Sequence, residues 1–466
     1  MAATLFLLFF LCVLVSTNAE ISSKMGINYG RLGNNLPSPS RSIEFIKTLE
    51  AGRIKLYDAN PEILNALAWT NIQVSIMVPN QLISNISSSQ AVADEWVRTN
   101  VIPFYSKTLI RHLLVGNEIF NFYSDEDRQT WYNLVLAMRR IKHSLSTYNI
   151  RNIKVGTPVA MDILETAFPP SNGAFRSDIA VPVMKPLLQF LNRTRSFFFL
   201  DVYPYFSWSR DPTRINLDYA LFRGNRTYTD PRSRLTYTNL LDQMLDSVIF
   251  AMTKLGFPNV RLVIAETGWP HAGDIDQIGA NIFNAATYNR NLIRRMTSKP
   301  PAGTPARPGV VIPTFIFALY NENQKGGPGT ERHWGLMNPD GTPVYEVDLN
   351  GKRPENDFKS LPAPLNNELY KGKIWCVVAD GANSTELESA IEFACRLGNN
   401  TCDAIRPGSE CYHPVSLVSH ASYAFSSYWA QFKQSGGTCY FNGLAVQTTE
   451  DPSNGSCKFP SVTLRG

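Results

Sequence analysis

The distribution of cysteine divides the chain into two parts that must stay folded by different means. Of the seven cysteines, Cys12 lies in an N-terminal apolar stretch, and residues 20–375 contain none. The other six fall in the last fifth of the chain: Cys376, Cys395, Cys402, Cys411, Cys439 and Cys457. A long chain can bury enough apolar surface to fold without cross-links, whereas a short segment gains much from them. We therefore predict two domains.

The N-terminus is typical of a secretory signal peptide at residues 1–19. An apolar run at 5–15 is followed by small and polar residues that end at Ala19, and the run is too short to span a bilayer comfortably. An N-terminal membrane anchor is the alternative. Removal of the signal would take Cys12 away and leave six cysteines, the even number expected of an exported chain with three disulfides.

Export would make six Asn-x-Ser/Thr triplets candidates for glycosylation, which requires a surface position. They begin at Asn85, Asn192, Asn225, Asn383, Asn399 and Asn454. No later segment is apolar for the ~18 residues that a membrane span needs, and the chain ends shortly after Cys457 on polar residues. We expect a secreted protein, extracellular or in the cell wall, without a membrane anchor.

Eight short, apolar, β-prone runs recur through the first part of the chain. They lie at 25–28, 53–57, 73–78, 113–115, 154–159, 197–202, 262–265 and 311–319. Segments with the apolar spacing of helices lie between most of them, at 131–145, 240–255 and 278–296. This alternation predicts an α/β fold with a (β/α)8 TIM barrel over residues 20–350. An open, doubly wound sheet is the alternative, although no Gly-x-Gly-x-x-Gly follows the first run.

The cysteine-rich part reads as a small, separate, disulfide-stabilised α+β module. A proline-containing linker at 351–374 precedes it, the module itself covers 375–458, and a short polar tail follows at 459–466. No Cys-x-x-Cys and no histidine at zinc spacing is present, which argues against a metal site. Spacing alone leaves all fifteen pairings of six cysteines open.

The overall charge argues against one class of partner. The formal net charge is only +5, and no run of Lys or Arg exceeds two residues. Nucleic-acid-binding proteins concentrate more positive charge on one face, so we expect no nucleic-acid partner. We also expect no cofactor and a monomer.

Two glutamates are candidates for catalysis because each directly follows a predicted barrel strand. Glu118 follows the fourth strand and Glu266 the seventh, and these strands lie nearly opposite each other in an eight-stranded barrel. Active sites of such barrels sit at the carboxyl ends of the strands. Two carboxyl groups in different ionisation states suit glycoside hydrolysis. Asn117 could bond a sugar 2-hydroxyl. A structural ion pair with Arg31 or Arg53 is the alternative for either glutamate alone.

Several motifs in the first part carry a resemblance to a known family. They are VRLVIAETGWPHA at 260–272, GINYGR at 26–31, VGNE at 115–118, DVYPYF at 201–206, ALYNENQK at 318–325 and ERHWGL at 331–336. Together they resemble plant β-1,3-glucanases of glycoside hydrolase family 17, in order, across residues 24–348. The resemblance implies a (β/α)8 barrel that hydrolyses internal β-1,3-glucosidic bonds with retention of configuration.

Roles for individual residues follow from the resemblance. It implies that Glu266 is the nucleophile and Glu118 the acid/base, and that Glu322, Lys325 and Glu331 support this pair. Lys325 could lower the pKa of a neighbouring carboxylate, and the extra glutamates could raise that of the proton donor. Aromatic side chains expected along the glucan-binding groove are Tyr57, Tyr203, Phe206 and Trp269.

The cysteine-rich segment resembles carbohydrate-binding module family 43, which accompanies many plant β-1,3-glucanases and binds β-1,3-glucan. The matching residues include WC at 375–376, CY at 411–412, ASYAFSSY at 421–428 and DPSNGSC at 451–457. The resemblance implies the bridges Cys376–Cys439, Cys395–Cys402 and Cys411–Cys457. Aromatic candidates for contact with sugar are Tyr423, Phe425, Tyr428 and Trp429, although their helical spacing also suits a core.

The sequence thus predicts a secreted, endo-acting, retaining hydrolase of β-1,3-glucan such as callose or fungal wall glucan. Two other functions stay open at this point. One is a non-catalytic wall protein that binds β-1,3-glucan, and the other is a β-1,3-glucan transglycosylase. The intact set of carboxylates favours activity over mere binding.

Overall fold

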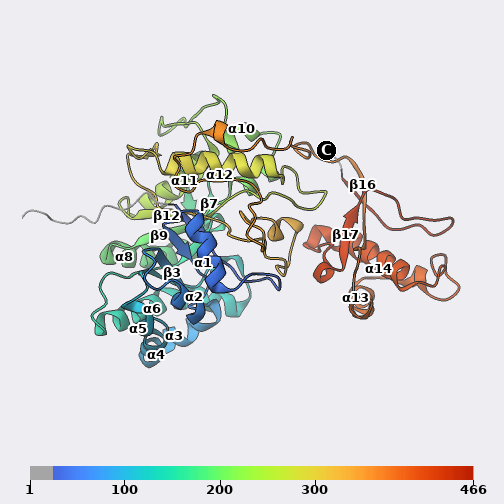
Figure 1. Cartoon of the computed structure of the whole chain (residues 1–466), viewed down its shortest axis with the longest axis horizontal. Helices are drawn as coiled ribbons and strands as arrows, with labels where there is room; N and C mark the ends of the chain where they lie inside the picture. Colours follow the sequence, from blue (N-terminus) through green and yellow to red (C-terminus); the bar gives the residue numbers. More distant parts are fainter. Residues whose placement is uncertain (1–24, 465–466) are drawn as a thin grey trace, which may run out of the picture.

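The computed structural model describes residues 25–464 and contains two bodies that lie side by side (Figure 1). The larger body is formed by the first part of the chain, and the smaller one by the cysteine-rich part near the C-terminus. The predicted signal peptide at 1–19 lies outside the described residues.

A parallel sheet forms the centre of the larger body, in the order β5-β4-β3-β2-β1-β15-β12-β9-β6. All eight predicted strands are present, and the fifth is divided at Thr157 into two pieces. One piece pairs with β4 and the other with β9, so this segment closes the sheet into a ring. The prediction of a (β/α)8 barrel is confirmed, and the open sheet is wrong. The strands are β1 (Gly26–Asn28), β2 (Arg53–Lys55), β3 (Gln73–Val78), β4 (Ile110–Val115), β5 (Lys154–Gly156), β6 (Pro158–Ala160), β9 (Phe197–Asp201), β12 (Arg261–Thr267) and β15 (Thr314–Ile316).

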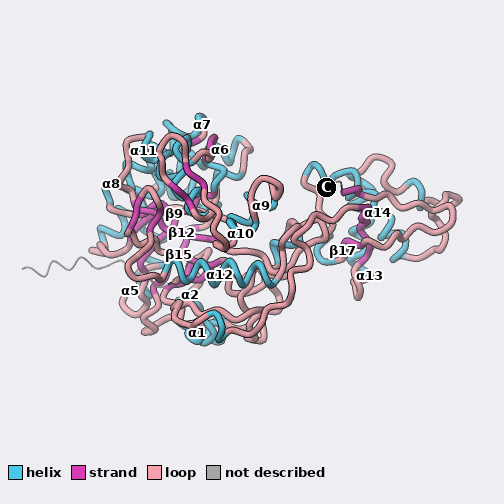
Figure 2. The backbone as a smooth tube through the Cα atoms, turned by 90° about the horizontal axis from the view of Figure 1, so that it is seen from above, coloured by secondary structure: helices cyan, strands magenta, loops and turns pink. Residues whose placement is uncertain are grey.

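The strands are mostly apolar on both faces because both faces are covered. Alternate side chains fill the barrel interior, where Met77, Leu114, Phe199, Val263 and Phe315 belong to one buried cluster. The opposite faces pack under a layer of helices (Figure 2). The helices are α1 (Pro39–Thr48), α2 (Pro61–Ala66), α3 (Ile83–Ser88), α4 (Gln90–Asn100), α5 (Ile102–Tyr105), α6 (Asp125–Thr147), α7 (Ser177–Ile179), α8 (Lys185–Thr194), α9 (Pro204–Arg210), α10 (Leu217–Ala220), α11 (Leu240–Lys254) and α12 (Ile282–Met296).

Side-chain caps explain where the three predicted helices begin. Ser124 and Asp127 form a capping box at the start of α6, and the Asn239 side chain caps α11. The apolar pattern placed the start of α12 at residue 278. The helix begins four residues later because the Asn281 side chain accepts from the backbone of Asn284, which fixes the first turn there.

The smaller body is a three-stranded antiparallel sheet with two helices, which confirms the predicted α+β module. Its elements are β16 (Gly372–Val378), α13 (Ser384–Leu397), α14 (Leu417–Phe432), β17 (Ala445–Thr448) and β18 (Val462–Leu464). Three disulfides cross-link it: Cys376–Cys439, Cys395–Cys402 and Cys411–Cys457. These are the pairings that the resemblance implied.

The module extends past both of its predicted ends. Residues 372–374, assigned to the linker, and 462–464, assigned to a polar tail, pair with each other as strands. Val462 and Leu464 pack against the module core, which explains why this segment is ordered. The predicted linker also lies against the barrel, because Arg290 of α12 pairs with Glu355 and stacks on Phe358.

The six asparagines of the glycosylation triplets are all exposed, so each meets the surface requirement. Attachment of glycan itself stays a prediction. Among residues 25–464, no helix combines the length and apolar character needed to cross a membrane.

Candidate active site

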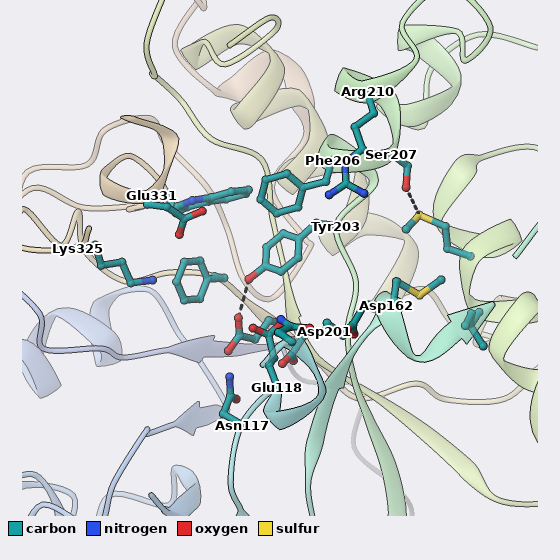
Figure 3. A pocket seen from close by; sticks show the side chains of 18 of the residues that line it. Asn117, Glu118, Asp162, Asp201, Tyr203, Phe206, Ser207, Arg210, Lys325 and Glu331 are labelled. Carbon is teal, nitrogen blue, oxygen red and sulfur yellow. Dashed lines mark hydrogen bonds between the residues drawn. The ribbon is translucent and has the colours of Figure 1, made fainter. Parts of the chain in front are cut away.

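A cleft of about 660 Å³ opens at the carboxyl ends of the barrel strands (Figure 3). Carboxylates and aromatic rings line the cleft together, as the sequence predicted for the carboxyl ends of the barrel strands. The lining includes Tyr57, Asn117, Glu118, Asp162, Asp201, Tyr203, Phe206, Arg210, Glu266, Phe317, Lys325, Glu331 and Trp334.

Glu266 is held at the base of this cleft by three hydrogen-bond donors. The Lys55 Nζ and the Tyr57 hydroxyl both donate to its Oε1 at 2.6 Å, and the Tyr203 hydroxyl donates to its Oε2 at 2.7 Å. A register shift in the pairing of β12 with β9 sets Glu266 directly beside Asp201. Such irregularities re-aim side chains next to active sites.

The environment of Glu266 favours its ionised form. Burial would raise the pKa of this carboxyl, but the charge and hydrogen bond of Lys55, with the two tyrosine hydrogen bonds, lower the pKa below its usual value. Burial and the Glu266 charge raise the pKa of both Tyr57 and Tyr203 well above 10, so their hydroxyls stay protonated and donate.

Glu118 is aimed into the cleft by an unusual backbone conformation just after β4. Its φ of 48° lies in the left-handed region, which costs a non-glycine residue ~1–2 kcal/mol and is typical of functional sites. Its backbone N–H donates to the Pro158 carbonyl at 3.0 Å. The neighbouring Asn117 is clamped by Asn80, whose side chain bonds both the N–H and the C=O of that residue.

Glu118 is kept protonated near neutral pH. Burial and the negative charge of Glu266 raise the pKa of Glu118 to about 8, against an opposing effect of Lys55. One glutamate of the pair is therefore ionised, and the other carries a proton. That difference is what a proton donor and a nucleophile at one glycosidic bond require.

The three predicted supporting residues occupy different places. Lys325 and Glu331 line the cleft. Burial raises the pKa of Glu331 above its usual value, and the Lys325 charge opposes this rise only in part. Glu322 joins the loop after β1 to Lys325: its Oε1 accepts from the Leu32 N–H at 2.8 Å, and its Oε2 lies 3.7 Å from the Lys325 Nζ. A side chain at Gly30 would collide with this carboxylate, so the contact requires glycine there.

The predicted groove aromatics divide into three cases. Phe206 lines the cleft, where its ring packs edge-on against Tyr203. Tyr57 and Tyr203 also line it, but their hydroxyls point to Glu266. The prediction for Trp269 is wrong: this side chain is 0% exposed, and its Nε1 donates to the Gly279 carbonyl within a core of aromatic rings.

No catalytic or binding role was predicted for two buried residues of the site, Lys55 and Asp201. Lys55 is 0% exposed and pairs with Glu266, and its Nζ also donates to Asn117 Oδ1 at 3.3 Å. The signal was present, because a lysine between Ile54 and Leu56 in an apolar strand needs a buried partner. Asp201 also lines the cleft, and burial and the Glu266 charge raise its pKa well above the usual value.

Across residues 25–464, no group of three or more His, Cys, Asp or Glu side chains is arranged to hold a metal ion. Lys55 is the cation that pairs with Glu266, at 2.6 Å between its Nζ and the Oε1.

Comparison with known proteins places this geometry in a family. Residues 25–349 match glycosyl hydrolases family 17, and residues 374–446 match the X8 domain. The chain belongs to glycosyl hydrolase family 17. This family 17 hydrolase is 60% identical over 448 residues, covering 96% of this chain and 93% of the relative, to a probable glucan endo-1,3-beta-glucosidase A6 of Arabidopsis thaliana.

A more distant relative and two solved structures of other proteins also resemble this family 17 hydrolase. A glucan endo-1,3-beta-D-glucosidase of Olea europaea is 34% identical over 462 residues, which cover 98% of each chain. Among solved structures, CJP38, a beta-1,3-glucanase and allergen of Cryptomeria japonica pollen, is 43% identical with a TM-score of 0.66. The match covers 70% of this chain and 99% of CJP38. The structure of a plant beta-glucan endohydrolase is 36% identical with a TM-score of 0.63, and the match covers 70% of this chain and 100% of that protein.

Proposed function

We propose that this family 17 hydrolase is a secreted, endo-acting, retaining glucan endo-1,3-β-glucosidase that cleaves β-1,3-glucans such as callose or fungal wall glucan. The single observation that carries the proposal is that two glutamates in one cleft have opposite ionisation states. Glu266 receives three donors, whereas the pKa of Glu118 is raised to about 8. The names of the relatives supply the linkage and the endo mode.

In the first chemical step, the Glu266 carboxylate attacks the anomeric carbon of the sugar. The bond from that carbon to the leaving oxygen breaks as Glu118 transfers its proton to the oxygen. Glu118 is then ionised and Glu266 is an ester. In the second step, Glu118 takes a proton from water while the water oxygen attacks the same carbon, which releases Glu266 and restores the starting state.

The neighbours of Glu266 keep its carboxylate ionised, and so able to attack, by lowering its pKa. The Lys55 charge and the two tyrosine hydroxyls stabilise the carboxylate between turnovers, and all three are fixed before substrate binds. Once Glu266 becomes an ester, its negative charge no longer raises the pKa of Glu118. The fall in that pKa suits the change of Glu118 from acid to base.

Secretion is part of the proposal on three grounds. Residues 1–19 are typical of a signal peptide, and all six glycosylation triplets lie at the surface. Three disulfides cross-link the module, and such bonds persist in oxidising compartments outside the cytosol.

The test is an assay of reducing ends released from linear β-1,3-glucan between about pH 4 and 7. We expect rapid release with products of several lengths, and negligible release from a β-1,4-linked glucan. Mass spectrometry of the products measures their lengths and so distinguishes hydrolysis from transglycosylation. Binding without release would show a wall-binding protein, and products longer than the substrate would show a transglycosylase, and either result contradicts the proposal.

A further inference from the structure

A second cavity, of about 770 Å³, lies between the module and the barrel. One wall is a face of α13, and another is the chain from 436 to 444 of the module. The barrel contributes Gly326 and Gly327, which follow directly after Lys325 of the catalytic cleft. The two cavities therefore meet at a single loop.

The module is held against the barrel by specific contacts. Lys433 forms an ion pair with Asp276, whose other oxygen accepts from the Gln447 side chain at 3.1 Å. Ile275 of the barrel packs against the module core. At the loop itself, the Tyr440 hydroxyl donates to the Asn323 carbonyl at 2.9 Å. These contacts hold the module in one position on the barrel.

Arg332 connects the shared loop to the module. Its Nη1 donates to the carbonyls of Lys325, at 2.9 Å, and Gly327, at 3.1 Å. The same guanidinium lies 3.5 Å from the centre of the Tyr440 ring, a close cation–π contact. Lys325 lines the catalytic cleft, and Gly327 and Tyr440 line the second cavity. One arginine thus holds together the residues that separate the two cavities.

The lining of the second cavity suits a neutral, hydroxyl-rich ligand. Phe393, Tyr428 and Phe441 form an aromatic cluster on its wall, with ring centres 5.5–6.4 Å apart. Hydroxyl and amide groups surround them, from Thr385, Ser389, Thr438 and Asn442. Among residues 25–464, Glu386 is the only charged side chain in the lining, so an anionic ligand finds no cation in this part of the chain. Aromatic rings beside polar groups are the usual composition of a small-molecule or sugar site.

The other module aromatics proposed for sugar contact do not reach this cavity. Tyr423, Phe425 and Trp429 are buried in the module core, which corrects the prediction for these three. Tyr428 alone of the four is half-buried and lines the cavity.

We propose that the second cavity is a saccharide subsite built jointly by module and barrel, and that one β-1,3-glucan strand passes from the catalytic cleft over Gly326 and Gly327 into it. This inference rests on the proposed function. Because the module is fixed in place, a strand held in the cavity raises the effective concentration of its continuation at Glu118 and Glu266. The module then contributes to the hydrolysis of long strands, beyond attaching the enzyme to a glucan surface.

Gly326 offers a way to test the path of the strand. A Cβ added at this position would meet nothing within 4 Å, so a side chain can start there without a clash. Gly327 does not offer the same test, because its φ of +87° disfavours other residues. Gly326→Trp would place bulk on the loop between the two cavities and leave the module surface as it is.

The experiment compares kcat/KM for a long, soluble, linear β-1,3-glucan with kcat/KM for a laminari-oligosaccharide short enough to occupy the cleft alone. We expect the long-to-short ratio to fall about tenfold in Gly326→Trp and about five- to tenfold in Phe393→Ala, which removes one aromatic face. Leu397→Ala is the matched control, an exposed apolar residue of α13 outside the cavity, and should keep the wild-type ratio. Thermal melting of each variant verifies folding.

Two results would overturn the inference. One is an unchanged ratio in both cavity variants. The other is a loss confined to Phe393→Ala with Gly326→Trp unaffected, which would show that the module binds glucan independently of the barrel. Failure of the proposed function is distinguishable from both, because the wild-type enzyme would then hydrolyse neither substrate.

Discussion

Glu266→Gln should lower kcat for β-1,3-glucan by at least about 10⁴-fold, because the amide cannot attack the anomeric carbon. The same change leaves the buried Lys55 without a counter-charge, which by itself destabilises the fold by about 3–5 kcal/mol. Loss of activity could then reflect loss of structure. Glu266→Asp separates the two effects, because it keeps the charge for Lys55 but withdraws the carboxylate by one methylene.

Both variants should retain binding to insoluble β-1,3-glucan, measured by co-sedimentation, while the release of reducing ends disappears. Glu126→Gln provides the matched control, since this glutamate is exposed in the first turn of α6, and its activity should equal that of the wild type. Activity of a folded Glu266→Gln enzyme within tenfold of the wild type would exclude Glu266 as the nucleophile.

Lys55→Met should move the whole pH–activity profile to higher pH. The active form needs Glu266 ionised, which sets the acid limb, and Glu118 protonated, which sets the alkaline limb. The Lys55 charge lowers the pKa of both groups, so its removal raises both. Activity on the acid side should fall about tenfold for each pH unit by which that limb moves. Methionine preserves the volume of the buried side chain.

Tyr203→Phe provides the comparison that separates charge from hydrogen bonding. It removes one hydrogen-bond donor from Glu266 and changes no charge. The acid limb of the profile should therefore move to higher pH, while the alkaline limb near pH 8 stays in place. Measurement of kcat/KM over the full pH range distinguishes the two variants. A shift of the acid limb to lower pH in Lys55→Met, or no shift in either variant, would contradict the account of how Glu266 is kept ionised.

The barrel was predictable because its strands are buried on both faces. Runs such as 73–78 and 197–202 are mostly apolar, and their alternation with helical spacing leaves few folds open. Glu118 and Glu266 were predictable for a related reason: each is a carboxylate close to the carboxyl end of an apolar strand, where barrel enzymes place their chemistry.

Side-chain direction was not predictable where the strand pattern ends. Trp269 lies only three residues after Glu266, yet it turns into the core, where its large ring is buried and its Nε1 finds the Gly279 carbonyl. Lys55 was missed for a different reason: a lysine inside an apolar strand signals that a buried partner is needed, but the sequence does not show that the partner lies 211 residues away. The pairing of residues 462–464 with the start of β16 is likewise a long-range contact in the module.

The stereochemistry of the first product tests most directly the claim that Glu266 attacks and Glu118 donates. Proton NMR, recorded within minutes of mixing enzyme with a β-1,3-gluco-oligosaccharide, reports the anomeric configuration before mutarotation scrambles it. Two displacements at the same carbon predict the β-anomer as the initial product. Initial formation of the α-anomer would show a single displacement by water and would contradict the assignment of Glu266 as a nucleophile.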